Sequence, residues 1–512
     1  MAEQNSIHGL WRSRWLFILA ATGSAVGLGN IWKFPYITGE NGGGAFVLVY
    51  LFCICMIGLP VMIAEVMLGR MGRQSPINTM SALVKDQNRS RAWVGIGWMG
   101  ALAGFLILSF YSVIAGWALD YITIMASGGF VGVTASGASD AFSNLLSSPS
   151  TLIIWHTIFM VLTLAVVARG VNKGLEKAIQ VLMPLLFVLL LVLLGYAFNT
   201  EGFSKGFDFL FSFDFSKLTR ESFIVALGHA FFTLSLGLGA IMAYGAYMPG
   251  NTSIAKTVVM VGVLDTLVAL TAGLIIFPIV FTNGLEPSSG PGLLFQSLPI
   301  AFGHMPGGIV FGTLFFLLVA FAAWSSSISL AEPIVAWAVE SKGVSRLVAA
   351  SWVGVAAWVL GIGTVLSFNL WSNGQFFVSV DELQTIIEGD KTMASVINSQ
   401  FFLYANVADL NALYAGHDDI SYKISGKTFF DCLDFLTTNI LLPVGGLFIA
   451  IFVGWSMRQS DVVAEIRSSS ETLYKVWLFV LRFIAPVAVA VVLVHGLWPG
   501  LIEGFLSMLG FS

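Results

Sequence analysis

Two glycine-rich stretches carry the residue types that could do chemistry in this chain. The first reads GSAVGLGN at residues 23–30, inside an apolar run at residues 15–36, and the second is residues 231–239. Glycine weakens a helix, and at membrane depth each freed backbone N–H and C=O must find a new partner. Both stretches therefore predict interrupted helices whose unpaired backbone N–H and C=O groups face a ligand.

The two ends of a broken helix suit different ligands. Carbonyls at the end of the first half suit Na⁺, and N–H groups at the start of the second half suit a carboxylate. The first stretch offers carbonyls at Gly23, Ala25 and Val26, and N–H groups near Leu28 and Gly29. It therefore predicts a cation site back to back with an anion site.

Side chains elsewhere could add neutral oxygens to a cation site. They are Asn30, Thr233, Ser235 and the triple serine at residues 325–327. A Na⁺ site needs about five or six hard oxygens, and neutral ones avoid the cost of burying charge. The alternative for the serines is that their hydroxyls bond back to their own helix or join neighbouring helices.

Asp265 lies deep in the apolar segment 254–282. A carboxylate inside a membrane indicates a functional site. The alternative is a structural hydrogen bond to a freed helix end. Burial disfavours a lone carboxylate, so Asp265 could take up a proton once Na⁺ leaves and provide a proton return path.

Composition places these residues in a membrane protein. The chain has 512 residues, of which 57% are hydrophobic and only 10% charged, and its long apolar stretches predict transmembrane helices in a lipid bilayer. Eleven spans are expected. Their approximate ranges are 14–37, 43–69, 94–126, 150–168, 176–198, 222–247, 254–282, 307–339, 347–370, 429–455 and 473–496.

Charge and cysteine content exclude other classes. The net charge of −4 is uninformative about nucleic acid, but no basic patch appears, so no nucleic-acid partner is expected. The three cysteines make no disulfide framework, and packing is the better interpretation for Cys53 and Cys55. The apolar stretch after Arg14 runs past any plausible cleavage site, so no cleavable signal peptide is expected.

Orientation follows from Lys and Arg, most of which fall in the segments that are cytoplasmic when the N-terminus is inside. We therefore expect a multi-pass protein of the cell inner (plasma) membrane, with a cytoplasmic N-terminus and an external C-terminus. The breaks fall in spans 1 and 6, the spacing of a 5+5 inverted repeat. The fold class is thus all-α and polytopic, with broken helices 1 and 6.

The expected organisation has five parts and two unusual external segments. The parts are a cytoplasmic N-terminal segment (1–13), a first five-helix repeat (14–198), a second (222–455), an eleventh helix (473–496) and an external C-terminal tail (497–512). Segment 283–306, rich in Gly and Pro, predicts a re-entrant or capping loop. The polar insertion 371–428 is interpreted as a small solvated subdomain rather than a functional lid.

Several motifs together resemble the neurotransmitter:sodium symporters, and in pattern the bacterial amino-acid transporters with the leucine-transporter fold. The motifs are WRSR at 11–14, residues 23–30 followed by KFPY at 33–36, ENGGGAF at 40–46, GLP at 58–60, RGVNKG at 169–174, residues 231–239 and FDCLD at 430–434. The resemblance covers about 1–370 and 428–496.

The resemblance implies two Na⁺ sites. One would use the Ala25 carbonyl, Asn30, Thr233, Asp265 and the substrate carboxylate. The other would use the carbonyls of Gly23, Val26 and Ala322 with the hydroxyls of Ser325 and Ser326.

The substrate site would lie between the two ions. The substrate carboxylate would bind the N–H groups of Leu28 and Gly29 and the Tyr111 hydroxyl. The substrate amine would bind the carbonyls of Ala25, Phe232 and Thr233, and also Ser235. The side-chain pocket would consist of Ser24, Ile107, Tyr111, Phe232, Leu238, Ser326 and Leu330.

The resemblance also implies two gates. Outside, Lys33 would pair with Asp434, and because Lys replaces the usual Arg this gate could be looser. Inside, His8 would pair with Glu340, beside Trp11 and Tyr247. A histidine there would make the inner gate depend on pH, unless His8 is only a surface residue.

Departures from the family pattern narrow the chemical class of the substrate. Monoamine carriers have Asp where this chain has Gly27, which favours an α-amino acid. Chloride-dependent relatives have Gln, Asn and Ser where this chain has His229, Asp265 and Ala269, so no chloride requirement is expected. The apolar walls at Leu238 and Leu330 fit a neutral hydrophobic side chain, from leucine to tryptophan in size.

The predicted function is Na⁺-coupled symport of a neutral hydrophobic amino acid by alternating access, with Na⁺ as the coupling ion. Within transporters, the alternative is a carrier of GABA, betaine or another osmolyte. An ion channel is disfavoured because the two breaks differ, whereas filters repeat symmetrically. An enzyme is disfavoured because the chain shows neither a metal-spaced cluster nor a nucleophile–base pair.

Overall fold

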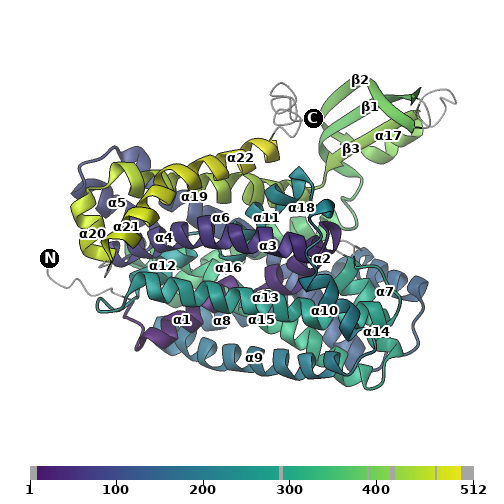
Figure 1. Cartoon of the computed structure of the whole chain (residues 1–512), viewed down its shortest axis with the longest axis horizontal. Helices are drawn as coiled ribbons and strands as arrows, with labels where there is room; N and C mark the ends of the chain where they lie inside the picture. Colours follow the sequence, from purple (N-terminus) through teal and green to yellow (C-terminus); the bar gives the residue numbers. More distant parts are fainter. Residues whose placement is uncertain (1–7, 288–291, 389–390, 415–420, 467–469, 498–512) are drawn as a thin grey trace.

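The helices of the computed structural model run along its longest axis, as Figure 1 shows for α9 (Glu176–Phe198), α13 (Ile254–Thr282) and α15 (Gly308–Lys342). The structure describes residues 8–287, 292–388, 391–414, 421–466 and 470–497. The start of the described chain lies at one end of this axis, together with α5 (Pro76–Asp86) and α20 (Gln459–Ile466). The insertion lies at the opposite end, so the connections divide between two ends of a bundle.

Nine helices of the described chain are long and apolar enough to cross a membrane, and one bent pair makes up to ten. The pair is α1 (Arg14–Ala25) with η1 and α2 (Gly29–Glu40), bent by 54°. The nine are Gly44–Gly72 (α3, η2, α4), Arg91–Ala126 (η3, α6), Pro149–Val167 (α8), Val171–Phe198 (η4, α9), Ile254–Thr282 (α13), Gly308–Lys342 (α15), Arg346–Ser367 (α16), Phe429–Ser456 (α18, η7, α19, η8) and Glu471–Leu497 (α21, η9, α22).

The expected span at 222–247 consists of two shorter helices, α11 (Arg220–Thr233) and α12 (Ala240–Ala246). Thr219 caps α11. The Thr219 hydroxyl accepts from the Ser222 N–H, and the Ser222 hydroxyl accepts from the Thr219 N–H. The intervening residues include three with left-handed backbone, Ser235 at φ 54°, Gly237 at 74° and Gly239 at 70°. The helix therefore stops and restarts, as the glycine content predicts.

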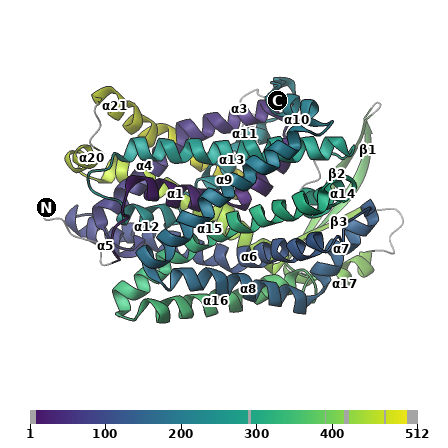
Figure 2. The same cartoon turned by 90° about the horizontal axis from the view of Figure 1, so that it is seen from below.

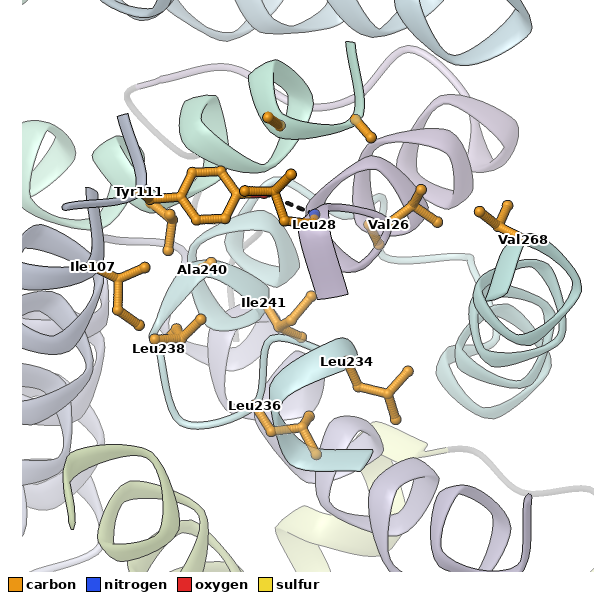
Figure 3. Close-up of a cluster of buried hydrophobic side chains, with 14 of the residues drawn as sticks. Val26, Leu28, Ile107, Tyr111, Leu234, Leu236, Leu238, Ala240, Ile241 and Val268 are labelled. Atoms are coloured by element: carbon orange, nitrogen blue, oxygen red, sulfur yellow. Dashed lines mark hydrogen bonds between the residues drawn. The ribbon is translucent and has the colours of Figure 1, made fainter. Parts of the chain in front are cut away.

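The two broken helices meet inside the bundle. The Ser235 hydroxyl, in the α11–α12 break, donates to the Ser24 carbonyl of α1 at 2.8 Å. Every residue of α12 is buried, and so is α1 from Ala20 onward. Figure 3 shows the two breaks side by side, with Leu234 to Ala240 next to Val26 and Leu28.

Short helices cover the end of the bundle near the insertion. They are α7 (Ala135–Ser147), α10 (Phe203–Phe211), η5 (Phe215–Lys217), η6 (Leu293–Ser297) and α14 (Leu298–His304) (Figures 1 and 2). In η6, the Phe295 carbonyl accepts from the Tyr121 hydroxyl at 2.8 Å. The described part of segment 283–306 thus folds as helical turns against the bundle, while residues 288–291 lie outside the described residues.

The insertion differs from the all-α expectation, because it contains a sheet. Its strands β1 (Gly374–Glu388), β2 (Lys391–Asn406) and β3 (Ser421–Lys427) pair antiparallel in the order β2-β1-β3, and α17 (Val407–Tyr414) lies beside them. Runs such as FFVSV and FFLY are aromatic and β-branched, which favours strands. Figure 1 shows the sheet projecting beyond the helices as a small subdomain.

Candidate functional site

The break in α1 leaves carbonyls with too few donors. The Ser326 hydroxyl of α15 (Gly308–Lys342) lies 3.4, 3.3 and 3.0 Å from the carbonyl oxygens of Gly23, Ser24 and Val26. The Ser24 carbonyl also accepts from Ser235, whereas the single hydrogen of the Ser326 hydroxyl can serve Gly23 or Val26 but not both at once. The arrangement therefore holds a surplus of acceptor oxygens over donors, which is what a hard cation needs.

Ser325 and Ala322 lie beside these carbonyls. The Ser325 hydroxyl donates to the Ala322 carbonyl at 3.0 Å. A Cβ at Gly23 would lie 3.4 Å from the Ser325 Cβ, which places the two residues in contact. All five members of the predicted second Na⁺ set thus come from the facing segments of α1 and α15. Ser327 instead bonds back to the Ala323 carbonyl at 2.9 Å, the alternative expected for serines in a membrane helix.

Asp265 of α13 (Ile254–Thr282) is completely buried and joins both broken helices. The Asn30 amide donates to Asp265 Oδ1 at 2.7 Å, and the Thr233 hydroxyl lies 3.2 Å from each carboxylate oxygen. Asn30 Oδ1 accepts from the Gly27 N–H at 3.0 Å. The structure thus brings three of the residues predicted for the first Na⁺ site into one hydrogen-bonded group, and Ala25 lines the neighbouring cavity.

The N–H end of the same break faces α6 (Gly95–Ala126). The Leu28 N–H donates to the Tyr111 hydroxyl at 3.0 Å, the contact drawn as a dashed line in Figure 3. Tyr111 is buried, and Ile107 and Leu238 lie below its ring in the same view. A hydroxyl and a helix N-terminus therefore converge on one point, an arrangement that suits a carboxylate.

A cavity of about 30 Å³ opens at this point, and ten of the twelve predicted substrate-site residues line it. They are Ser24, Ala25, Gly29, Ile107, Tyr111, Phe232, Ser235, Leu238, Ser326 and Leu330. The other two, Leu28 and Thr233, bond to Tyr111 and Asp265. Gly27 also lines the cavity, and a Cβ there would lie 2.6 Å from Ser326 Oγ and 2.8 Å from the Tyr111 oxygen. No side chain fits at position 27 without displacing both groups.

Glu65 of α4 (Leu59–Gly72) is a site residue that the sequence reasoning missed. It is completely buried, and its carboxylate accepts from the Gly237 N–H at 3.1 Å in the α11–α12 break. It therefore satisfies a backbone group that the break sets free. The rule that singled out Asp265, a lone acid in an apolar span, would also have found Glu65.

At the predicted outer gate, Lys33 lies near the cavity. Its Nζ is 4.7 Å from the centroid of the Phe232 ring. Among the ion pairs of the described residues there is none between Lys33 and Asp434. The lysine thus covers the ring that closes the cavity, and it does not pair directly with the carboxylate.

At the predicted inner gate, His8 Nε2 lies 2.9 Å from Glu340 Oε1, and the His8 side chain is only 4% exposed. The alternative of a surface histidine therefore does not describe this structure. Glu340 also accepts from the Ser75 N–H at 2.8 Å and the Asn78 amide at 2.7 Å. Trp11 packs here too, and its backbone N–H donates to the Tyr247 carbonyl at 2.9 Å.

A second ion pair next to this gate was not predicted. Arg346 pairs with Glu332, which also accepts from the Tyr247 hydroxyl at 2.7 Å. Arg346 Nη1 lies 3.4 Å from His8 Nδ1. Glu332 could have been found as another lone acid in an apolar span, whereas the position of Arg346 depends on tertiary contacts. We call His8, Tyr247, Glu332, Glu340 and Arg346 the inner cluster.

Comparisons with known proteins agree with this arrangement. A model of the sodium:neurotransmitter symporter family matches residues 8–128 and 142–378. An uncharacterized sodium-dependent transporter, YhdH, from Bacillus subtilis is 36% identical over 502 residues, covering 97% of this chain and 98% of its own length. An uncharacterized sodium-dependent transporter from Haemophilus influenzae is 31% identical, covering 97% and 100%. The crystal structure of MhsT in complex with L-phenylalanine is similar with a TM-score of 0.78 and 39% identity, covering 95% of this chain and 99% of that chain.

Proposed function

The chain belongs to the sodium:neurotransmitter symporter family, and on that premise we propose that it couples inward Na⁺ flow to uptake of a neutral hydrophobic α-amino acid. The observation that carries the proposal is the pairing of two opposite half-sites at one helix break. Surplus carbonyls lie on one side and the Leu28 N–H with the Tyr111 hydroxyl on the other, around a small cavity. A zwitterion and a cation can both be bound there.

We infer two Na⁺ sites. The first would use the Ala25 carbonyl, Asn30, Thr233 and Asp265, with the substrate carboxylate as a further ligand. The second would use the carbonyls of Gly23, Val26 and Ala322 with Ser325 and Ser326. The surplus acceptor oxygens around Ser326 support the second site, and the hydrogen-bonded Asn30–Asp265–Thr233 group supports the first.

The absence of a side chain at Gly27 supports an α-amino acid. A carrier of ligands without a carboxylate would need an acid near this position, and there is no space for one beside Ser326 and Tyr111. Leu238, Ile107 and Leu330 line the cavity with apolar surface, which supports a hydrophobic substrate. That the similar MhsT was crystallised with L-phenylalanine supports the same class.

We propose that transport does not require chloride. Asp265 holds a negative charge next to the first Na⁺ site, where chloride would otherwise be needed. Ala269, one turn further along α13, offers no hydroxyl to an anion. The hydrogen bonds from Asn30 and Thr233 support a charged Asp265 while Na⁺ is bound.

We further infer eleven spans arranged as two inverted five-helix repeats and a final helix, with α11 and α12 together forming span 6. The N-terminus would be cytoplasmic and the insertion external. The central contact between the two breaks supports this arrangement, because corresponding broken helices of an inverted repeat lie side by side.

Uptake into proteoliposomes tests the proposal. Labelled phenylalanine or leucine should accumulate under an inward Na⁺ gradient, and not when K⁺ replaces Na⁺. Uptake should be unchanged when gluconate replaces chloride. Unlabelled tryptophan and leucine should compete, and GABA and betaine should not. Accumulation that GABA or betaine blocks would instead identify an osmolyte carrier, and loss of uptake in gluconate would refute chloride independence.

A further inference from the structure

The insertion rejoins the bundle directly above the predicted outer gate. Its last strand, β3, ends at Lys427, which pairs with Phe376 of β1. The next residue, Thr428, caps α18 (Phe429–Asp434), and its N–H and hydroxyl both donate to the Asp431 carboxylate, at 2.9 and 2.8 Å. The backbone of Lys427 is therefore fixed from both sides, by the sheet and by the helix cap.

The Lys427 side chain shares a cavity with the gate carboxylate. The cavity has a volume of about 370 Å³, and its lining includes Lys427, Asp431, Asp434 and Asn439. Lys427 Nζ lies 4.5 Å from the centroid of the Phe435 ring, which also lines it. A cation carried by the insertion thus faces Asp434 across open space.

Two lysines therefore lie near Asp434. Lys33 and Lys427 both interact electrostatically with its carboxylate. Among the ion pairs of the described residues none joins Asp434 to either lysine, and each lysine instead rests on an aromatic ring, at 4.7 Å for Lys33 and 4.5 Å for Lys427. A cation–π contact of this kind is weak and readily exchanged for a carboxylate.

We propose that Lys427 is a second cation of the outer gate, which competes with Lys33 for Asp434 and couples the insertion to gating. The inference rests on the proposed transport function and its outer gate. Lys33 belongs to η1 (Gly29–Lys33) in the broken helix, whereas Lys427 belongs to the insertion. When the broken helix moves Lys33 away, Lys427 keeps the carboxylate neutralised, so opening does not leave Asp434 without a cation nearby.

A double-mutant cycle tests the proposal. We expect Lys427→Gln to raise the KM of Na⁺-driven uptake about three-fold, as for a half-exposed charge pair, and to have no effect in an Asp434→Asn background. In a Lys33→Gln background, Lys427→Gln should raise the KM by a larger factor, because no second cation remains. Lys427→Arg should restore the wild-type KM. Lys423→Gln, on the exposed face of the same strand, is the matched control and should change nothing.

A labelling assay keeps this test separate from the transport proposal. Cys432 lies next to the gate, 3.9 Å from the Lys427 carbonyl, and is partly exposed. Its reaction with an impermeant maleimide needs no transported substrate. Lys427→Gln should raise the labelling rate in Na⁺ when Asp434 is present and leave it unchanged in Asp434→Asn, whereas Lys423→Gln should not alter it.

The possible outcomes are distinct. Equal effects of Lys427→Gln with and without Asp434, in uptake and in labelling, would overturn the gate role. The same effect from Lys423→Gln would assign it to surface charge and would also overturn the proposal. Coupling in the labelling assay without uptake of any amino acid would support the gate and refute the proposed substrate class.

Discussion

At the residue scale, the Tyr111 hydroxyl is the most direct test of the substrate site. It accepts from the Leu28 N–H at 3.0 Å and faces the cavity between the two half-sites. Tyr111→Phe keeps the ring and removes only this polar group. Since a hydrogen bond to a charged group contributes about 1.5–3 kcal/mol, the KM of amino-acid uptake should rise roughly 10-fold or more.

Tyr121 provides the matched control for this substitution. It lies on the same helix, is buried, and donates to the Phe295 carbonyl at 2.8 Å near the end of the bundle. Tyr121→Phe should lower thermal stability slightly and leave the KM unchanged. Equal KM changes in both variants would mean that Tyr111 does not bind substrate.

At the element scale, the α11–α12 break depends on Glu65. Its buried carboxylate accepts from the Gly237 N–H, and Gly237 and Gly239 have left-handed backbone. Glu65→Leu leaves that N–H without its partner, which costs about 1–3 kcal/mol. We expect a lower melting temperature in detergent together with a large loss of uptake. Glu65→Gln keeps an acceptor oxygen and should retain much of both.

The inner cluster connects the described start of the chain with α15 and α16. His8 Nδ1 faces the Arg346 guanidinium, so Nδ1 accepts and Nε2 carries the proton donated to Glu340. The ring therefore satisfies both contacts. A side chain without this donor and acceptor would leave Glu340 and Arg346 each one contact short, although Glu332 still pairs with the arginine.

Loss of these two contacts should therefore loosen this end of the molecule. We expect His8→Ala to raise the reactivity of a cysteine placed at Ser75, next to Glu340, when both are measured at the same pH, because a buried polar group left without its partner costs about 1–3 kcal/mol. His8→Gln keeps a donor and an acceptor and should change the reactivity less than His8→Ala does. Equal reactivity with His, Gln and Ala at position 8 would mean that His8 does not hold this end closed.

At the scale of the whole molecule, local sequence patterns predicted the helices and the breaks better than the contacts between them. Residues 23–30 and 231–239 are breaks because of their own glycines. The sheet of the insertion was missed because its alternation is short and lies within a polar segment. Arg346 was missed for a different reason. Only the folded bundle brings it next to Glu332 and His8, and no spacing in the chain encodes that contact.

The last prediction concerns how the whole chain lies in the membrane. α22 (Ala485–Leu497) ends at the same end of the bundle as the sheet, opposite the start of the described chain (Figure 1). Lys and Arg are concentrated around residues 70–91, so the end of the bundle where the described chain starts should be cytoplasmic. An alkaline phosphatase fused after residue 512 should therefore be active in the periplasm. The same enzyme fused after residue 88, between α5 and η3, should be inactive.

An inactive C-terminal fusion, with an active one at residue 88, would reverse the orientation. Inactivity at both places would instead mean that an even number of segments crosses the bilayer.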